Sequence, residues 1–501
     1  MAIKVVTPEE MSGIDRKTIE DFGIPSFTLM ESAGRSVYSF IRSLFEDDLK
    51  FLNVAVVVGK GNNGGDGLVV ARYLMDKVSN VDIFLLSEAA AFKGDARKNF
   101  ELVEKMGINL VEVDVLPSLE EYDLIVDAIF GTGFRGQPDD RLLKCFEKIN
   151  LSGTLVISVD IPSGVSGETG EVIKGAVVAD YTITMGTVKR GHLLYPGKAF
   201  TGELYIADIG IPESFYQEID VLVPEVDDIK ALLPVRIGNE HKGNMGRVLV
   251  VAGATGFTGA ASLASQAAIV SGAGLVYLAI PEDLNSIMEV KLTEVITLPY
   301  TTLDNFEKIL NLYDFDVVAF GPGLGRTSET VEKLRLILDR FKGPLVIDAD
   351  GIWALSNLKE TKFKVPVILT PHPGEAAFLL KKSPADIDKN RIEDAALISD
   401  SYNATVVLKG APTIIKIKNG NTYINPTGNP GMASGGVGDV LTGMIAGFIA
   451  QGISPEDSAL ISPYIHGFVA DLLLEEESEE SIVATKILEN IGKGLNILRE
   501  E

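Results

Sequence analysis

Residues 54–67 read VAVVVGKGNNGGDG, and this stretch indicates how the first half of the chain folds. Val54–Val58 form an unbroken apolar run, which is typical of a strand buried on both faces of a parallel sheet. The glycines, asparagines and aspartate of Gly59–Gly67 predict a tight turn into a helix that begins near Leu68. A buried strand, a glycine-rich loop and a helix together form the repeating unit of an open α/β fold.

The same pattern recurs in two series along the chain. Apolar residues repeat at helical spacing across Leu29–Leu44. Further buried strands of the first half are predicted at Val81–Leu86, Leu124–Ile129, Thr154–Val159 and Tyr181–Met185. Those of the second half are predicted at Arg247–Ala252, Leu275–Ile280, Val317–Phe320, Leu345–Ile347, Val367–Leu369 and Thr405–Leu408. A hairpin of Thr413–Lys418 and Thr422–Asn425 then turns at Asn419-Gly420, and helices are predicted at 439–452 and 455–474.

Residues 212–240 interrupt this pattern. They contain an acidic stretch with Pro224 and Pro234, and they show no clear strand. We therefore place a domain boundary near residue 222 and predict two fused α/β domains.

Composition excludes several classes of protein. The 501 residues carry a formal net charge of −25, so the surface repels phosphate backbones and anionic lipids, and neither nucleic acid nor a membrane is expected as a main partner. Cys145 is the single cysteine, which rules out an intrachain disulfide and suits a reducing compartment. The first residues lack the apolar core of a signal peptide, and the uncharged stretch Val248–Pro281 fits a strand, loop, helix and strand better than a membrane span. We expect a cytoplasmic enzyme.

The first glycine loop invites comparison with NAD-dependent dehydrogenases. Gly59, Gly61 and Gly64 satisfy the dinucleotide fingerprint when it is read literally. The Asp66 carboxylate lies inside the loop, however, where it would oppose a pyrophosphate, and no hydride-transfer apparatus follows. We therefore interpret the loop as part of a different site.

Asp127 and Asp160 each end a predicted strand, as that loop does. Ligands of open parallel sheets bind beyond the carboxyl ends of the strands, so these groups should face one another. An isolated aspartate there usually caps a turn or a helix, but two facing a polar loop favour a binding site. The oxygens of Asn63, Asp127 and Ser163 would suit a hard cation, and Lys189 near Asp160 would suit an acid/base partner.

A second glycine run, NPGMASGGVGD at residues 429–439, precedes an apolar helical pattern. Gly435, Gly436 and Gly438 let the backbone approach a phosphate, and the N–H groups and dipole of a helix start attract anions. Asp439 can then take a proton from a hydroxyl while those N–H groups hold the phosphoryl group. A mere helix cap would not need the neighbouring glycines.

Three other strand ends fit the same site. Phe320–Gly325 offers a glycine floor, Leu408–Thr413 could hold a nucleotide, and Thr370–Glu375 presents His372. A histidine between two prolines is about as often structural as functional.

Four motifs in this order resemble the bifunctional NAD(P)H-hydrate repair enzymes, which fuse an epimerase domain to an ADP-dependent dehydratase domain. GKGNNGGDG at 59–67 resembles the epimerase signature. HKGNMG at 241–246, TPHPGE at 370–375 and NPGMASGGVGD at 429–439 resemble the dehydratase signature, with Ser434 where threonine is commoner. The resemblance implies an epimerase domain at 1–220, with a Rossmann-like three-layer αβα sandwich, and a ribokinase-like dehydratase domain at 225–501.

The first domain is thereby expected to interconvert the R and S forms of nicotinamide dinucleotides hydrated at ring carbon 6, termed NAD(P)HX. Asp160 and Lys189 match the acid/base positions, and Asn63, Asp127 and Ser163 match a potassium site. The positions that match substrate contacts are Asn62, Asn63, Gly64, Gly65, Asp66, Gly131, Thr132, Gly133, Phe134, Arg135, Gly136, Gln137 and Asp160.

The second domain is expected to dehydrate the S form with ADP and magnesium. Asp439 matches the base that activates the ring hydroxyl for phosphorylation, and Gly323, His372 and Asp439 match substrate contacts. The positions that match ADP contacts are Lys409, Gly410, Ala411, Pro412, Thr413, Asn429, Pro430, Gly431, Met432, Ala433, Ser434, Gly435, Gly436, Val437 and Gly438. We also expect a homo-oligomer.

Two other functions compete with this one. A vitamin or sugar kinase would use the same Gly-Asp device and carry a non-catalytic N-terminal binding domain. A protein- or RNA-binding scaffold would have no need of Asn63, Asp127, Asp160 and Lys189.

Overall fold

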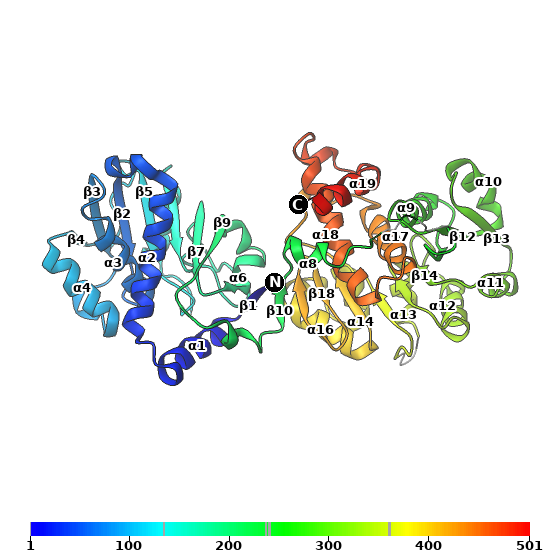
Figure 1. The fold of residues 1–501 in the computed structure, drawn as a ribbon, viewed down its shortest axis with the longest axis horizontal. Coiled ribbons are helices and arrows are strands. Elements are labelled where there is room, and N and C mark those ends of the chain that lie inside the picture. The colour runs from blue at the N-terminus through cyan, green and yellow to red at the C-terminus, as the bar shows by residue number, and fades with distance from the viewer. Residues whose placement is uncertain (1, 134–135, 236–237, 239–241, 359–361, 501) are drawn as a thin grey trace. The chain divides into compact units, whose positions relative to one another are not determined.

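The computed structural model of the protein describes residues 2–133, 136–235, 238, 242–358 and 362–500. The chain divides into two compact units, Ile3–Asp220 and Val221–Glu501, the latter including Ala2 (Figure 1). Each unit places helices against a largely parallel sheet, which confirms the predicted α/β class.

A seven-stranded parallel sheet forms the centre of the first unit, in the order β4-β3-β2-β5-β6-β7-β9. Its strands are β2 (Asn53–Val58), β3 (Asn80–Leu85), β4 (Asn109–Glu112), β5 (Leu124–Ala128), β6 (Leu155–Val159), β7 (Tyr181–Met185) and β9 (Glu203–Ala207). A short parallel pair joins β1 (Ile3–Val6) to β8 (Val188–Lys189). The strand order reverses between β2 and β5, so a topological switch point lies beyond their carboxyl ends.

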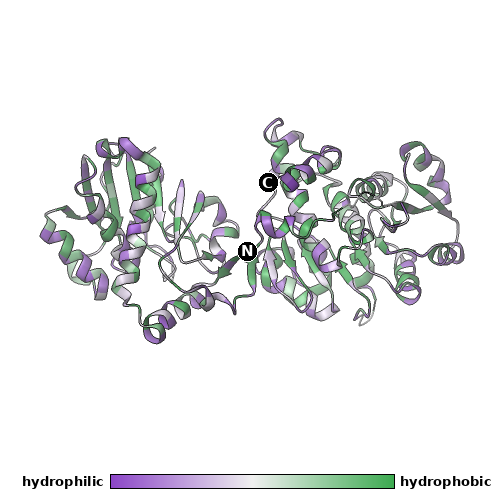
Figure 2. Cartoon of the chain, in the orientation of Figure 1, coloured by the Kyte–Doolittle hydropathy of each residue, from purple (hydrophilic) through white to green (hydrophobic). Residues whose placement is uncertain are grey.

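Helices cover both faces of this sheet. They are α1 (Pro8–Lys17), α2 (Ser26–Phe45), α3 (Asn62–Leu74), α4 (Gly94–Met106), α5 (Asp140–Asn150) and the short α6 (Arg190–Leu193) and α7 (Lys198–Thr201). Val54, Val56 and Val58 pack in one core with α1–α4, whereas Ala55 and Val57 pack in another with α5. The hydrophobic strand is therefore buried on both faces, under helices with hydrophilic outer sides (Figure 2).

The sheet of the second unit runs in the order β13-β12-β11-β14-β15-β16-β17-β18-β19-β10. Its strands are β10 (Val221–Val223), β11 (Arg247–Val251), β12 (Leu275–Pro281), β13 (Ile296–Tyr300), β14 (Val317–Phe320), β15 (Leu345–Ile347), β16 (Val367–Leu369), β17 (Thr405–Leu408), β18 (Ile414–Lys416) and β19 (Thr422–Ile424). The neighbours from β13 to β17 are parallel, and β17, β18 and β19 pair antiparallel through the predicted hairpin. The order reverses at β11.

Among the helices of this unit, α9 (Thr258–Val270) and α17 (Val437–Ala450) pack together against the sheet, and α18 (Pro455–Leu473) and α19 (Ala484–Glu500) pack against them. The remaining helices are α8 (Val226–Lys230), α10 (Glu282–Lys291), α11 (Leu303–Leu310), α12 (Ser328–Arg340), α13 (Asp350–Ser356), α14 (Pro373–Leu380), α15 (Pro384–Lys389) and α16 (Arg391–Tyr402). The uncharged stretch from residue 248 forms β11, α9 and β12, as predicted. Within the described ranges, every helix is too short or too polar to span a bilayer.

Three details differ from the sequence prediction. Helix α3 begins at Asn62 rather than near Leu68, because Gly61 caps it and the Gly61 carbonyl already accepts the Gly65 N–H. Helix α17 begins at Val437, not at 439. The segment 212–240, which showed no clear strand, contains the apolar strand β10, which pairs with β19 through Val221 and Leu222.

Two candidate active sites

The first candidate site lies at the carboxyl ends of β2 and β5. A Cβ on Gly64 would lie 1.7 Å from the Gly59 carbonyl oxygen, and a Cβ on Gly59 would lie 2.1 Å from that of Ile129. The glycines therefore permit the close turn from β2 into α3. The first turns of that helix consist of the predicted substrate-binding residues Asn62, Asn63, Gly64, Gly65 and Asp66.

Asp160 and Lys189, the predicted acid/base residues, form a buried ion pair. Lys189 Nζ donates to Asp160 Oδ1 at 2.6 Å and to Thr184 Oγ1 and the Met185 carbonyl at 2.8 Å each. All three ammonium donors are therefore used. Burial would raise the pKa of Asp160, but the charge and hydrogen bond of Lys189 hold it below its ordinary value. Asp160 also has a φ of +66°, a strained conformation for a residue with a side chain.

His192 supports this pair, a role that the sequence did not predict. Its Nδ1 accepts the Lys189 backbone N–H at 3.1 Å, and its Nε2 lies 2.9 Å from the Asp160 carbonyl oxygen. Burial and the charge of Lys189 lower the pKa of His192 to about 4. The ring is neutral, and its Nε2–H donates to the Asp160 carbonyl.

The loop after β5 approaches the same carboxylate. The Thr132 N–H donates to Asp160 Oδ2 at 3.3 Å, and a Cβ on Gly131 would lie 3.1 Å from that oxygen and 3.3 Å from Asn63 Cγ. The structure thus brings these four predicted residues together. Later in the loop, Gly133 and Gly136 have open space beside them, with Gln137 following, and Phe134 and Arg135 lie outside the described residues.

Asn63, Asp127 and Ser163, the predicted potassium ligands, carry the oxygen atoms that a hard cation prefers. Ser163 Oγ donates to Asp127 Oδ1 at 2.6 Å, and the Ser163 N–H and Ser158 Oγ donate to Oδ2 at 2.9 and 2.8 Å. Burial raises the pKa of Asp127, while these hydrogen bonds oppose the shift. The Asn63 amide is buried and both of its polar atoms lack a hydrogen-bond partner among the described residues. An unsatisfied buried amide oxygen is a suitable ligand position for such a cation.

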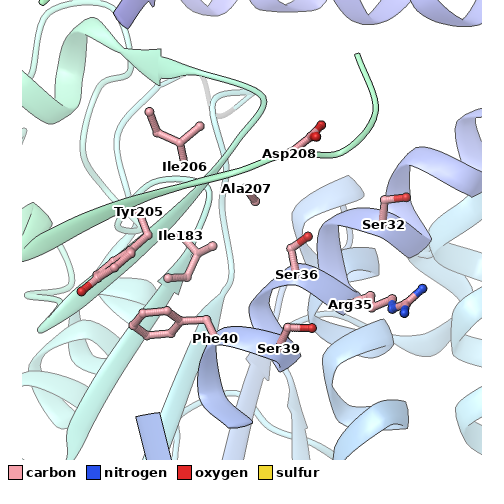
Figure 3. A pocket seen from close by; sticks show the side chains of 10 residues that line it. All are labelled: Ser32, Arg35, Ser36, Ser39, Phe40, Ile183, Tyr205, Ile206, Ala207 and Asp208. Atoms are coloured by element: carbon pink, nitrogen blue, oxygen red, sulfur yellow. The ribbon is translucent and has the colours of Figure 1, made fainter. Parts of the chain in front are cut away.

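A separate cavity of about 460 Å³ lies between α2 and the edge strand β9 (Figure 3). Arg35 and Phe40 line it from the helix, and Tyr205 and Asp208 line it from the strand and the residue after it. None of the predicted site residues contributes to its lining.

The second candidate site lies at the start of α17. Gly436 is the N-cap of this helix, with a φ of +92° that favours glycine, and the first N–H groups of a helix lack acceptors within it. Asp439 is the third residue of the helix, so it is not the cap. Burial and the negative charge of Asp348 raise the pKa of Asp439 to about 7, although the positive charge of Lys409 opposes them. No hydrogen bond or ion pair to the described part of the chain occupies the Asp439 carboxylate.

Lys409 supplies the cation of this site but pairs with a different carboxylate. Its Nζ donates to Asp348 Oδ1 at 2.6 Å, and Thr442 Oγ1 donates to Asp348 Oδ2 at 2.7 Å. Glu375 Oε2 lies 3.8 Å from the same Nζ. Burial would lower the pKa of Lys409, but these two carboxylates raise it. A Cβ on Gly438 would lie 3.3 Å from Nζ, so the ammonium adjoins the start of α17.

The predicted nucleotide segment after β17 is held by Arg391. Its guanidinium donates to the carbonyls of Leu408, Lys409 and Pro412 at 2.8–3.2 Å. Gly410 adopts a φ of +139° directly over the guanidinium, and the Ala411-Pro412 peptide is cis. Thr413 Oγ1 donates to the Gly410 carbonyl at 3.1 Å.

The other predicted nucleotide segment is anchored at its start and at Ser434. Asp471 accepts the Gly428 N–H at 2.8 Å and the Asn429 side-chain amide at 2.9 Å. Ser434 Oγ donates to the Ile482 carbonyl at 3.3 Å. Between these anchors, Pro430, Gly431 and Met432 form a 3₁₀ turn, followed by Ala433. After Ser434, Gly435 leads to Gly436, Val437 and Gly438 at the helix start.

Gly323 and His372, the other predicted substrate contacts, lie at the ends of β14 and β16. Gly323 has a φ of +62°, and a Cβ there would lie 2.8 Å from Phe257 Cβ. His372 is the N-cap of α14, and its Nδ1 accepts the Gly374 N–H at 2.9 Å. The histidine thus has a structural role, while about half of its side chain remains exposed.

Asp348 and Glu375 are functional candidates that the sequence reasoning did not single out. Asp348 directly follows β15, the same signal that identified Asp160 after β6. Burial raises the pKa of Glu375 to about 7, against the positive charge of Lys409. In the described part of the chain, no three His, Cys, Asp or Glu side chains form a ready metal site. Carboxylates near a candidate phosphate site would suit magnesium that arrives with a nucleotide.

Comparisons with known proteins assign both parts of the chain to a family. A family profile described as NAD(P)H-hydrate dehydratase matches residues 248–493, and one described as YjeF-related protein N-terminus matches residues 26–191. The bifunctional NAD(P)H-hydrate repair enzyme Nnr of Moorella thermoacetica is 39% identical over 99% of this chain and 97% of its own length. The chain belongs to this family. The Escherichia coli member is 31% identical over 96% of this chain and 92% of its own length.

A solved structure supports the family assignment for the second unit. The ADP/ATP-dependent NAD(P)H-hydrate dehydratase from Bacillus subtilis, co-crystallized with ATP and Mg²⁺, matches with a TM-score of 0.51 and 31% identity. The match covers 55% of this chain and 99% of that one. The predicted ribokinase-like fold is thereby confirmed.

Proposed function

We propose that this protein repairs hydrated nicotinamide dinucleotides in two steps, with epimerisation of R- and S-NAD(P)HX in residues 1–220 and ADP-dependent dehydration of S-NAD(P)HX in residues 225–501. Full-length similarity to the repair enzymes supports this function over a vitamin or sugar kinase. The single observation that carries the dehydratase assignment is the unpaired Asp439 carboxylate at the glycine-capped start of α17.

Dehydration needs a phosphoryl transfer because hydroxide is a poor leaving group. Asp439, with its pKa near neutrality, accepts the proton of the ring hydroxyl as that oxygen attacks the terminal phosphorus of ADP. The oxygen–phosphorus bond of ADP breaks and AMP leaves. Phosphate then departs from ring carbon 6 with loss of a ring proton from carbon 5, which restores the dihydropyridine.

The chain supplies two stabilising groups for this transfer. The N–H groups at the start of α17 face developing negative charge, and each such donor is worth on the order of 3 kcal/mol. The Lys409 ammonium adjoins the same helix start and stays charged through Asp348. Magnesium would arrive with the nucleotide and neutralise its phosphates.

Epimerisation uses the Asp160–Lys189 pair. The lowered pKa of Asp160 keeps it as a carboxylate that can accept a proton from water or from the ring hydroxyl. Lys189 Nζ orients the Asp160 carboxylate through one hydrogen bond, and its bonds to Thr184 and the Met185 carbonyl hold the ammonium in place. Potassium would be held by Asn63, Asp127 and Ser163, and self-association of the chain stays a prediction.

The test is an assay with separate epimers. With the S form of hydrated NADH and ADP, we expect the near-ultraviolet absorbance of the reduced ring to return as AMP and phosphate form. The R form should give a comparable final yield of the reduced ring, because the first domain converts it to the S form. Formation of a phosphorylated vitamin or sugar, with no return of absorbance, would instead support the kinase.

A further inference from the structure

Helix α1 brings a carboxylate to the epimerase site that no motif of the sequence indicates. Pro8, Met11 and Asp15 lie on one side of this helix at positions three and four residues apart. Pro8 and Thr132 both lie beside Gly167, since a Cβ on Gly167 would lie 3.0 Å from the Pro8 side chain and 3.2 Å from that of Thr132. This side of α1 therefore faces the loops that surround Asp160.

The position of Met11 also shows that this side of α1 faces the site. A Cβ on Gly186 would lie 3.1 Å from the Met11 methyl and 2.6 Å from the Tyr216 hydroxyl. Gly186 follows Met185, whose carbonyl accepts Lys189 Nζ. The Tyr216 hydroxyl is buried without a hydrogen-bond partner in the described residues, and the nearby charge of Asp15 helps burial to raise its pKa.

Asp66 reaches the same place from α3. It lies one turn after Asn63, whose side chain meets Asp160 Oδ2 at Gly131. Burial and the charges of Asp160 and Asp15 raise the pKa of Asp66 well above its ordinary value, and Lys189 opposes the shift. Asp15, Asp66 and Asp160 therefore form one electrostatic cluster around a single lysine.

The lysine neutralises only one of these three carboxyl groups. Its donors are all used by Asp160, Thr184 and Met185, and neither Asp15 nor Asp66 forms a side-chain hydrogen bond or ion pair with the described residues. Unpaired carboxyl groups that lie close together retain a proton, because two like charges cannot both be stable there. Burial and Asp160 raise the pKa of Asp15 to about 6, whereas the charge of Lys189 lowers it. Burial and the neighbouring carboxylates thus favour the protonated form of Asp66, whereas Asp15 has a pKa of about 6.

Resting on the proposed function, we propose that Asp66 is the proton donor of the epimerase site and that Asp15 returns its proton from solvent, while Asp160 is the acceptor. Asp66 protonates the leaving hydroxyl as the carbon 6–oxygen bond breaks and the ring nitrogen lone pair forms a C=N⁺ bond. Water then adds to the other face of carbon 6 and gives a proton to Asp160. One proton is donated and one accepted, and Asp15 exchanges both with solvent, so the net reaction is isomerisation.

The matched variants are Asp15→Asn, Asp15→Glu and Asp21→Asn, the last removing an exposed carboxylate from the next turn of the chain. Conversion of R to S is followed without ADP, and dehydration of added S form with ADP reports an intact chain. We expect Asp15→Asn to slow epimerisation about 100-fold, within the range of proton-transfer effects, and to leave dehydration unchanged. Asp15→Glu should recover most of the rate, and Asp21→Asn should match the wild type.

The pH profile separates this role from a structural one. Epimerisation requires protonated Asp66, so its rate falls as the pH rises through the pKa of Asp66. The negative charge of Asp15 raises that pKa, so Asp15→Asn should move the alkaline limb to lower pH and Asp15→Glu should not. A wild-type rate in Asp15→Asn, or a slower rate with an unmoved limb, would overturn the proposal. A wild-type chain that cannot epimerise at all would instead overturn the proposed function on which it rests.

Discussion

Both halves of the molecule set an aspartate beside a lysine at the carboxyl edge of a parallel sheet, but they pair the two residues differently. In the first unit Lys189 binds Asp160 itself, and the pKa of that aspartate falls. In the second unit Lys409 binds Asp348 instead, which leaves Asp439 unpaired with a pKa near 7. Pairing rather than residue type therefore decides whether the aspartate is a fixed carboxylate or a group that exchanges protons at neutral pH.

The largest expected effect comes from removing the unpaired carboxylate. Asp439→Asn should lower the rate of S-NADHX dehydration by about 10³-fold, because the ring hydroxyl loses its proton acceptor. ADP binding should change little, since the helix N–H groups and Lys409 remain, and epimerisation should continue. Absorbance assays measure the rate of dehydration, and calorimetric titration measures the affinity for ADP. Joint loss of dehydration and ADP binding in a folded variant would contradict this division of roles.

A somewhat smaller effect is expected in the first unit. Asp160→Asn should slow epimerisation by about 10²- to 10³-fold and leave dehydration of the S form intact. Lys189 keeps Thr184 and the Met185 carbonyl as acceptors, so the chain should fold. The assay compares R and S substrates on one preparation. Epimerisation at the wild-type rate would refute the assignment of Asp160.

The smallest expected effect comes from changing the start of α17, the proposed phosphate site of the second unit. Gly436→Ala imposes a left-handed conformation on alanine, at about 1 kcal/mol, and its methyl would displace the end of Leu263. Gly452→Ala is the matched control, because Gly452 has a similar φ of +89° and open space around it. Both should lower thermal stability slightly, but only Gly436→Ala should weaken ADP binding several-fold. Equal ADP affinities would argue against a phosphate site at this helix start.

Much of the architecture was predictable because buried parallel strands appear in the sequence as unbroken apolar runs. Every such run that we identified, from Val54–Val58 to Thr405–Leu408, is a strand within two residues. Strands such as β9 were not predicted, since an edge strand exposes Tyr205 and Ile206 and loses the continuous pattern. The start of α3 was misplaced because asparagine and glycine usually favour turns. In the structure these residues form the first turns of a helix whose N-cap is Gly61.

The candidate sites were predictable only in part, for a related physical reason. Asp160 and Asp439 lie next to glycine-rich loops, which indicate an unusual backbone conformation in the sequence. Asp348 carries the same strand-end signal but lacks a glycine motif. Asp15 carries no signal, since an aspartate in a short amphipathic helix usually faces water, and only tertiary packing turns it toward Lys189. Which carboxylate pairs with each lysine likewise depends on distances in the folded chain, which residue spacing in the sequence does not determine.

The most direct test of the central contrast is the pH dependence of kcat/KM for dehydration of S-NADHX, measured for the wild type and for Asp348→Asn. The base must be ionised, and burial and Asp348 raise its pKa to about 7, so activity should fall as the pH drops through about 7. Asp348→Asn removes a negative neighbour and frees Lys409, so the midpoint should move to lower pH in a variant whose melting curve shows that it is folded. A wild-type profile without a limb near neutrality, or a midpoint that stays in place in Asp348→Asn, would contradict the account.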